Sequence, residues 1–316
     1  MAQTSAPQTW LITGCSSGFG EEFVRQLRAA GDNVIATGRN ASTKLAHLKE
    51  TGASILDLDV TASPEEITSK MAEAWNLYPD GIDVVVNNAG YILSGAFEEL
   101  RQEDLETSFK TNFHGPLNIT RALLPKLRAK GTGTLFYMSS QAAWHSDPSA
   151  TAYCSSKFAL EGVYPFLFLP AYFSSNGPLK TYNNLGAVEC LSKELAIFAP
   201  KIKVLLLEPG YFRTQAFSNI RHVPDRVDIY AQFNAGVKQF EQSVVGNEPG
   251  DSKKAIEIMI DLVKGTGVAA GKEIIPLRVP LGSDGLERIK AKCRETLKIC
   301  EDWEEVAKST DIKPAA

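Results

Sequence analysis

Short apolar runs alternate with amphipathic segments along most of the chain. The apolar runs predict strands at residues 10–13, 33–37, 54–58, 82–86, 133–138, 204–207 and 273–275. The amphipathic segments predict helices at residues 21–30, 64–75, 104–130, from 153 onward, and 253–264. Strands that are apolar on both faces and alternate with helices indicate a parallel sheet covered on both sides. The sequence therefore predicts an α/β fold, a doubly wound, Rossmann-like parallel sheet of about seven strands.

One stretch breaks this pattern inside the helix that begins at residue 153. Pro165, Pro170 and Pro178 are incompatible with a continuous helix. Removing residues 163–186 restores the apolar stripe of an amphipathic helix. The stripe consists of Leu160, Val188, Leu191, Leu195 and Phe198. We interpret residues 163–186 as an anomalous insertion, a retained intron or gene-model error, and the alternative is a genuine lid or membrane-touching insertion.

Length, charge and cysteine usage restrict the possible classes of function. The 316 residues carry a net charge of −4 and no basic block, which argues against nucleic acid as the main partner. The sequence suggests no signal peptide, and no apolar stretch is long enough to span a bilayer. The five cysteines form no CxxC pair and no metal-type spacing with the four histidines. We expect one domain over residues 1–316, with a C-terminal helical extension at 280–316, no metal site and a cytoplasmic location.

A glycine-rich turn follows the first predicted strand. Gly14, Gly18 and Gly20 lie between that strand and the next helix. Glycines permit a tight turn and a close approach to a pyrophosphate, and the N-terminus of the following helix attracts the anion. Such a motif alone is often an ordinary turn, but its place between strand and helix favours a dinucleotide site.

The end of the second predicted strand bears on the choice of cofactor. An acidic residue there would bind the ribose 2′-hydroxyl of NAD and repel a 2′-phosphate. The chain has Arg39 instead, whose charged planar group suits phosphate. We therefore favour NADP over NAD. A solvated arginine is the alternative, and Lys44 is either a second phosphate contact or simply an exposed lysine.

Candidate chemistry lies around Tyr153. Lys157 follows it by one helical turn, and Ser140 follows the fifth predicted strand. A tyrosine hydroxyl ordinarily titrates near pH ~10, and a nearby ammonium favours the phenolate. Tyr153 is therefore suited to act as general acid when a carbonyl is reduced and as general base when an alcohol is oxidised. We predict that Ser140 hydrogen-bonds the substrate oxygen. Each residue alone has a structural explanation, but the set at the carboxyl ends of strands favours catalysis.

Three largely apolar and aromatic segments are expected to surround the reacting carbonyl. They are Tyr91, Ile92 and Leu93; Ala142, Trp144 and His145; and Tyr211, Phe212 and Phe217. This composition predicts a lipophilic ketone, aldehyde or alcohol as substrate, without distinguishing steroid, polyketide, retinoid or xenobiotic. Trp144 and His145 are alternatively packing residues.

The spacing of these motifs resembles the short-chain dehydrogenase/reductase family. The resemblance is carried by T-G-x-x-x-G-x-G at residues 13–20, Asn87-Asn88-Ala89-Gly90, Asn112, Ser140, Tyr153, Lys157 and Pro209-Gly210. The tail at residues 280–303 is similar to that of 17β-hydroxysteroid and retinol dehydrogenases. The resemblance implies an NADP(H)-dependent oxidoreductase acting on CH–OH donors, with catalytic Ser140, Tyr153, Lys157 and Asn112.

The same resemblance implies individual roles for residues at the cofactor. Lys157 would hold the nicotinamide ribose, Asn112 would anchor a proton-relay water to Lys157, and Asp59 would contact the adenine ring. The implied cofactor contacts are Gly14, Ser16, Ser17, Gly18, Phe19, Gly20, Arg39, Asp59, Asn88, Ala89, Gly90, Tyr153, Lys157, Gly210 and Thr214. In the family, the helix carrying Tyr153 commonly builds the dimer face, so a homo-oligomer is an open expectation.

Two other functions stay open. A catalytically impaired or silent dinucleotide-binding protein is disfavoured by the retention of Ser140, Tyr153 and Lys157. An epimerase or dehydratase on a related fold is disfavoured by the glycine spacing and by the lack of a separate substrate domain.

Overall fold

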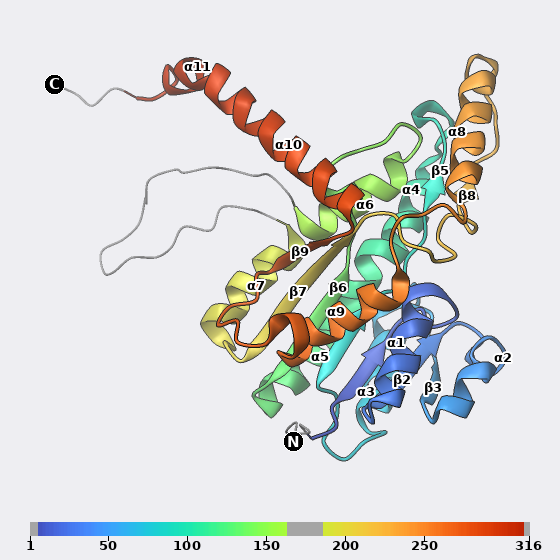
Figure 1. Ribbon diagram of the computed structural model, residues 1–316, viewed down its shortest axis with the longest axis vertical. Helices are drawn as coiled ribbons and strands as arrows, with labels where there is room; N and C mark the ends of the chain where they lie inside the picture. The colour runs from blue at the N-terminus through green and yellow to red at the C-terminus, as the bar shows by residue number, and fades with distance from the viewer. Residues whose placement is uncertain (1–5, 163–185, 313–316) are drawn as a thin grey trace.

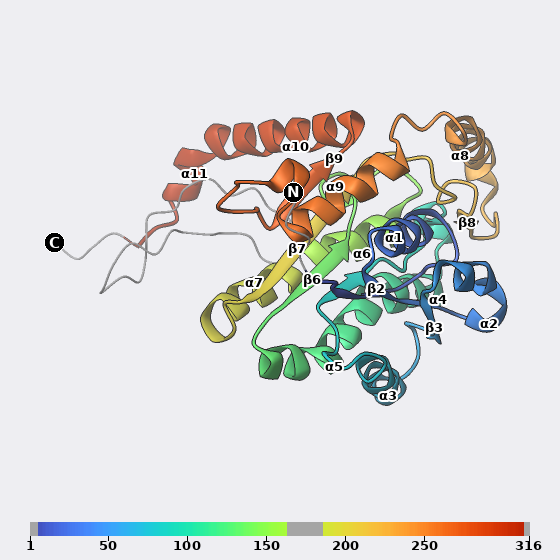
Figure 2. The same ribbon diagram turned by 60° about the horizontal axis from the view of Figure 1, so that its bottom comes forward.

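The computed structural model describes residues 6–162 and 186–312 (Figure 1). Residues 163–185 lie outside this description, so the interpretation of residues 163–186 as a retained intron stays a prediction. The chain forms a central sheet with helices on both faces (Figure 2).

Seven parallel strands form the central sheet, in the order β3-β2-β1-β4-β6-β7-β9. They are β1 (Thr9–Ile12), β2 (Asn33–Gly38), β3 (Ser54–Asp57), β4 (Val84–Asn87), β6 (Gly133–Met138), β7 (Ile202–Pro209) and β9 (Arg278–Leu281). The strand order reverses direction between β1 and β4, the point at which sheets of this kind bind ligands. The predicted doubly wound α/β fold is confirmed.

The seventh strand was predicted at residues 273–275, and this prediction is wrong. The observed strand is β9 (Arg278–Leu281), which pairs with β7 so that Pro280 lies opposite Glu208. Proline argues against a central strand because it cannot donate a ladder hydrogen bond, but β9 is an edge strand, where proline is tolerated. Ile274, in the middle of the predicted strand, is 77% exposed and lies outside the sheet. The C-terminal helices begin after β9.

Two apolar cores lie on the two faces of the sheet. Trp10 and Ile12 of β1 pack on one face with α1 (Gly18–Ala29) and α9 (Ser252–Lys264), whereas Leu11 packs on the other. This separation follows from the alternation of side chains along a strand. The second face is covered by α3 (Pro64–Trp75), α5 (Gly115–Lys130), α6 (Thr151–Glu161) and α7 (Ala187–Phe198).

The helix predicted at residues 104–130 has three parts. It consists of α4 (Gln102–Phe109), a π-helical turn, η3 (Lys110–His114), and α5. Pro116 follows closely and has no N–H to donate to the carbonyl of Asn112, four residues earlier. Single π-helical turns inside α-helices occur frequently at functional sites.

The remaining elements surround the carboxyl edge of the sheet. The short strands β5 (Leu93–Ser94) and β8 (Arg221–His222) pair with each other, and α8 (Ala231–Val244) lies beside them (Figure 1). The C-terminal α10 (Ser283–Asp302) and α11 (Glu304–Lys308) extend away from the sheet. The short helices are α2 (Ala41–Lys44), η1 (Ala46–Thr51), η2 (Phe97–Glu99), η4 (Gln141–Ala143), η5 (Asp228–Tyr230) and η6 (Gly267–Ala269).

The ends of α6 and α7 meet at the two sides of the anomalous segment. Gly162 caps α6 with a left-handed backbone, and a Cβ added to Gly186 would lie 1.8 Å from the Glu161 carbonyl oxygen. Of the predicted stripe, three residues are buried and Leu191 is partly buried in one shared core, whereas Phe198 is 75% exposed. The stripe prediction is therefore wrong at Phe198 only. Among the described residues, no helix has the length and apolar character needed to cross a membrane.

Candidate functional site

A cavity of about 1100 Å³ opens at the carboxyl edge of the sheet. Loops after β1, β2, β4, β6 and β7 contribute to its wall. It brings together most of the predicted site residues: Gly14, Ser16, Ser17, Gly18, Phe19, Arg39, Asp59, Asn88, Ala89, Gly90, Ser140, Tyr153, Lys157, Gly210 and Thr214. Gly20 and Asn112 do not line it. The glycine turn and the tyrosine–lysine pair therefore face one shared space.

The glycine turn is shaped to bring backbone close to a ligand. Gly14 and Gly18 have φ angles of +72° and +59°, which side chains disfavour. A Cβ on Gly20 would lie 2.2 Å from the Gly14 carbonyl oxygen, so Gly20 permits α1 to pack against the turn. Ser17, the N-cap of α1, makes no side-chain capping bond. The first N–H groups of α1 are thus left for an anion in the cavity.

Thr13 links the turn to the loop after β4. Its hydroxyl accepts hydrogen bonds from the backbone N–H groups of Asn88 (3.0 Å) and Ala89 (2.9 Å). The Asn88 side chain donates to the Thr13 carbonyl at 2.8 Å. Sequence reasoning omitted Thr13 from the site, although it is the first residue of the glycine motif.

The residues expected at the adenosine end also line the cavity. Arg39 and Lys44 are exposed on its wall. The Asp59 carboxylate accepts hydrogen bonds from the Thr61 N–H (2.9 Å) and hydroxyl (2.7 Å). These bonds fix the orientation of the Asp59 carboxylate at the cavity wall.

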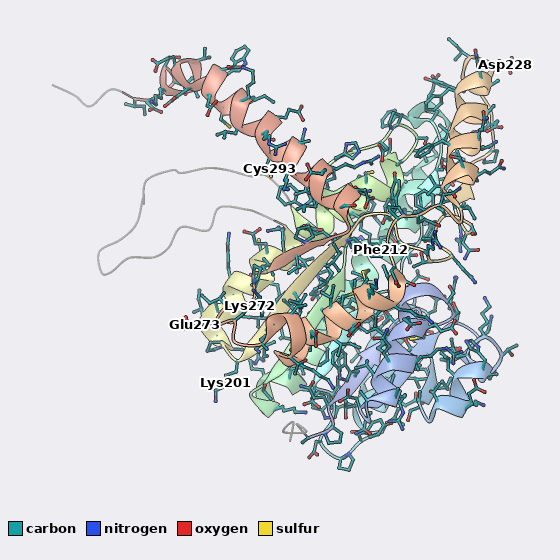
Figure 3. The ribbon with its side chains drawn as sticks, in the orientation of Figure 1. Lys201, Phe212, Asp228, Lys272, Glu273 and Cys293 are labelled. Carbon is teal, nitrogen blue, oxygen red and sulfur yellow. The ribbon has the colours of Figure 1, made fainter. Side chains whose placement is uncertain are left out.

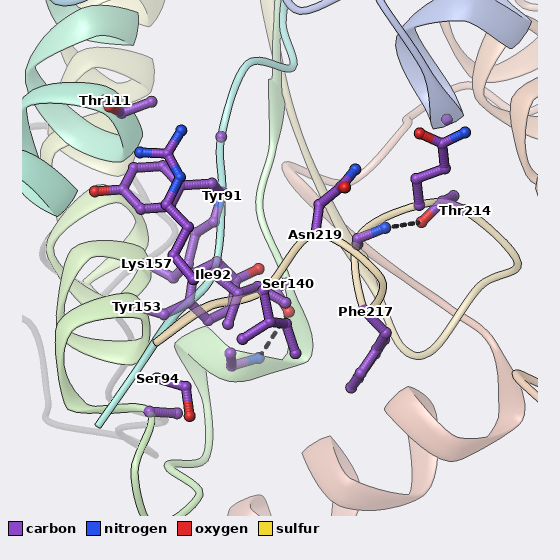
Figure 4. Close-up of a pocket in the computed structure, with 18 of the residues that line it drawn as sticks. Tyr91, Ile92, Ser94, Thr111, Ser140, Tyr153, Lys157, Thr214, Phe217 and Asn219 are labelled. Carbon is purple, nitrogen blue, oxygen red and sulfur yellow. Dashed lines mark hydrogen bonds between the residues drawn. The ribbon is translucent and has the colours of Figure 1, made fainter. Parts of the chain in front are cut away.

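The structure brings together the three residues predicted for proton transfer (Figure 4). The Ser140 hydroxyl accepts a hydrogen bond from the Ala142 N–H at 3.1 Å and is a hydrogen-bond partner of Tyr153. Lys157 donates to the Met138 carbonyl at 2.8 Å, and its Nζ lies 5.7 Å from the centroid of the Tyr153 ring. Ser140 is therefore both the N-cap of η4 and a neighbour of the Tyr153 hydroxyl.

Burial controls the protonation of this group. Burial raises the pKa of Tyr153 to about 12, and the hydrogen bond with Ser140 opposes the rise only in part. Burial also lowers the pKa of Lys157 to about 8, against the attraction of Glu161. The expected lowering of the tyrosine pKa by lysine is thus not found in the protein alone, because Lys157 lies over the ring and burial outweighs its charge. Tyr153 holds its proton at neutral pH.

Asn112 fixes the wall of the cavity rather than facing into it. Its Nδ2 donates to the Tyr91 carbonyl (3.1 Å) and to the Ser156 hydroxyl (3.0 Å), and its Oδ1 accepts from the Tyr91 N–H (3.1 Å). The side chain is therefore fully engaged. The Asn112 carbonyl has no α-helical donor from Pro116, so the predicted water relay would use this carbonyl, and it stays a prediction.

The residues expected around the substrate divide into two groups. Those that line the cavity are Tyr91, Ile92, Ala142, His145, Tyr211, Phe212 and Phe217. Phe212, labelled in Figure 3, packs on Phe19 with ring centroids 5.5 Å apart. Leu93 and Trp144 do not line the cavity, and their prediction is wrong. Leu93 of β5 packs with Ala152 and Val223. Trp144 packs with Ile289 and Cys293 of α10, in agreement with the alternative that it is a packing residue.

Sequence reasoning missed two parts of the cavity wall. One face of α8 lines it with Phe233, Val237 and Phe240, whose spacing is the available signal for an amphipathic helix. The second part is Asp147, whose carboxylate lies 3.0 Å from Arg288 of α10. No local pattern could pair these residues, because they are 141 positions apart.

The described residues contain no group of histidine, cysteine or acidic side chains that could hold a metal ion.

Comparisons with known proteins agree with this geometry. The sequence profile of the short chain dehydrogenase family matches residues 8–172. The chain is 29% identical to oxidoreductase calM of Penicillium decumbens, over 96% of this chain and 93% of that protein. It is 31% identical to the 3-ketodihydrosphingosine reductase of Bacteroides thetaiotaomicron, over 69% of each. A crystal structure of a short-chain dehydrogenase from Streptomyces avermitilis has a TM-score of 0.78 and 32% identity, covering 98% of this chain and 100% of that one.

Proposed function

The chain belongs to the short-chain dehydrogenase family, and we propose that it is an NADP(H)-dependent oxidoreductase that interconverts a lipophilic ketone or aldehyde and its alcohol. One observation carries the proposal. The glycine turn and the group of Ser140, Tyr153 and Lys157 line the same cavity, at the point where the strand order reverses.

The cavity wall has groups suited to each part of the cofactor. The open N-terminus of α1, with Gly14 and Gly18, suits the pyrophosphate. Arg39 suits a 2′-phosphate, since it is exposed at the cavity and its guanidinium can bond phosphate oxygens in pairs. Asp59 suits the adenine ring. A bound NADPH would supply the hydride.

The chain's own residues would supply the proton. Tyr153 stays protonated at neutral pH, so its hydroxyl can donate to the oxygen of a carbonyl as reduction proceeds. Ser140, its hydrogen-bond partner, would hold the same oxygen. Lys157 would hold the nicotinamide ribose, and its charge would stabilise the phenolate that remains after proton transfer. In the direction of oxidation, Tyr153 would accept the proton.

The walls of the cavity support an apolar substrate. Tyr91, Ile92, Tyr211 and Phe217 surround the space beside Ser140 and Tyr153. The 3-ketodihydrosphingosine reductase with which the chain shares 31% identity is named for a ketone of a long-chain lipid. Both observations favour a ketone within a largely apolar molecule.

The test is NADPH oxidation with a panel of lipophilic ketones and aldehydes, beside a direct measurement of NADPH binding. We expect substrate-dependent oxidation of NADPH by at least one member. The alternative, a catalytically silent binding protein, would bind NADPH but would not oxidise it with any ketone or aldehyde of the panel. Tight NADH binding without NADPH binding would refute the cofactor assignment.

Two further properties are proposed. A cytoplasmic location is supported by the five cysteines, which are all free of disulfides. A homo-oligomer is supported by Ile197 and Phe198 at the end of α7, which are 73% and 75% exposed. Cell fractionation tests the first, and light scattering of the wild type and of a Phe198→Ser variant tests the second.

A further inference from the structure

Arg221 is held in a fixed position on the cavity wall. Its backbone N–H donates to the Ile92 carbonyl at 3.0 Å, in the pairing of β8 with β5. Its guanidinium carbon lies 4.3 Å from the centroid of the Tyr91 ring. Asn112 in turn binds both backbone polar groups of Tyr91. The stacked guanidinium therefore has a rigid base and keeps its N–H edge available for an acceptor.

The charge of Arg221 is not compensated. Two other basic side chains near this end of the cavity have acidic partners: Arg288 lies 3.0 Å from Asp147, and His222 lies 2.5 Å from Glu241. Arg221 has no carboxylate within ion-pairing distance among residues 6–162 and 186–312, although it lines the cavity. The cavity wall beside Tyr91 thus contains an arginine available to an external anion.

An apolar surface lies next to this arginine. The contact of His222 with Glu241 joins β8 to α8, and α8 turns Phe233, Val237 and Phe240 toward the cavity. Phe233 and Phe240 are 38% and 52% exposed. Exposed aromatic rings inside a cavity indicate a surface that an apolar ligand covers.

From this arrangement we propose that Arg221 binds a carboxylate of the substrate while α8 covers its apolar body. The substrate class is then a lipophilic carbonyl compound that also carries a carboxylate. The inference rests on the proposed function for the place of the reacting carbonyl, beside Tyr153 and Ser140. The carboxylate contact itself depends only on Arg221 and the cavity wall.

The test is calorimetric binding of ω-phenylalkanoates of increasing chain length to the full chain saturated with NADPH. Each acid is compared with its neutral amide. We expect at least one acid to bind about two- to fivefold more tightly than its amide, because Arg221 is exposed and solvent screens the pair. The preference should fall as salt is added. Equal affinity for acid and amide throughout the series overturns the proposal.

Variants assign the effect to the residue. Arg221→Gln should abolish the preference for the acid, and Arg221→Lys should keep part of it through the retained charge. Arg121→Gln, on an exposed part of α5 where the arginine donates to Asn118, should leave the preference unchanged. An unchanged preference in both Arg221 variants overturns the proposal. A preference that is lost with Arg221 while no ketone is reduced refutes the proposed function and leaves the carboxylate contact standing.

Discussion

Deletion of residues 163–186 is expected to stabilise the protein. In the intact chain, α6 ends at Glu161 with Gly162 as its cap, and α7 begins after Gly186, yet the two ends touch. Leu160 and Val188 on the two sides of the interruption are buried in the same core. Joining the ends would let the N–H groups of the first turn of α7 bond the last carbonyls of α6. We propose that the joined chain forms one helix from Thr151 to Phe198.

The size of the effect follows from the general entropic cost of an insertion whose two ends are held in place. For any chain of ~24 residues, holding the two ends together costs about 3 kcal/mol of conformational entropy. Deletion removes this cost and pairs several backbone groups at the junction, each of which adds about 1 kcal/mol or less. Arg278 already ties the two helices, through Glu161 of α6 and Glu189 of α7, and should keep both contacts. For a chain of this size, 3 kcal/mol corresponds to a rise in Tm of roughly 5 °C.

The assay is thermal unfolding followed by circular dichroism, with and without NADPH. The matched control replaces residues 163–186 with a Gly/Ser linker of the same length, which keeps the loop-closure cost and should keep the Tm of the intact chain. A deletion variant with an unchanged or lower Tm would refute the reasoning. Sequencing of transcripts tests the retained-intron interpretation separately, since messages that mostly encode these residues would contradict it.

Three other predictions follow from the site and the core. Arg39→Asp should shift cofactor preference from NADPH to NADH, because the new carboxylate repels the 2′-phosphate. Unchanged affinities for both cofactors in fluorescence titrations would contradict a contact between Arg39 and the 2′-phosphate. Ketone reduction, measured as kcat/KM, should fall as pH rises through about 8, because Lys157 loses its charge there. Tyr153, with a pKa of about 12, keeps its proton over this range. A kcat/KM that stays constant up to pH 10 would contradict this prediction. Arg278→Met should lower the free energy of unfolding by about 3–5 kcal/mol in urea titrations, because Glu161, Glu189 and Glu208 are buried around this arginine; a loss no larger than that of Arg121→Gln would tell against it.

Local patterns in the sequence were sufficient for most of the fold. The strand β6 and the helix α3 occur at the predicted residues, because an apolar run and a Ser63 capping box are complete within a few positions. The strand β9 was misplaced, since only its position at the edge of the sheet makes Pro280 acceptable.

The candidate site was predictable to the extent that its residues follow strand ends. Ser140 and the glycine turn were found in this way. The direction of the Tyr153 pKa was not, because burial depends on elements distant in the chain. Arg221 was missed for a similar reason: it acquires a role only through the pairing of β8 with β5.

The most direct test of the account follows the transfer of deuterium from NADPH labelled at the reactive carbon to a ketone substrate. The wild type should place the label on the carbinol carbon. Tyr153→Phe should bind NADPH normally and transfer the label at least about 100-fold more slowly, since one proton donor is lost. Tyr78→Phe, which removes a hydroxyl bonded to Ser54 away from the cavity, should match the wild type. A Tyr153→Phe variant that transfers the label at the wild-type rate would contradict the central claim.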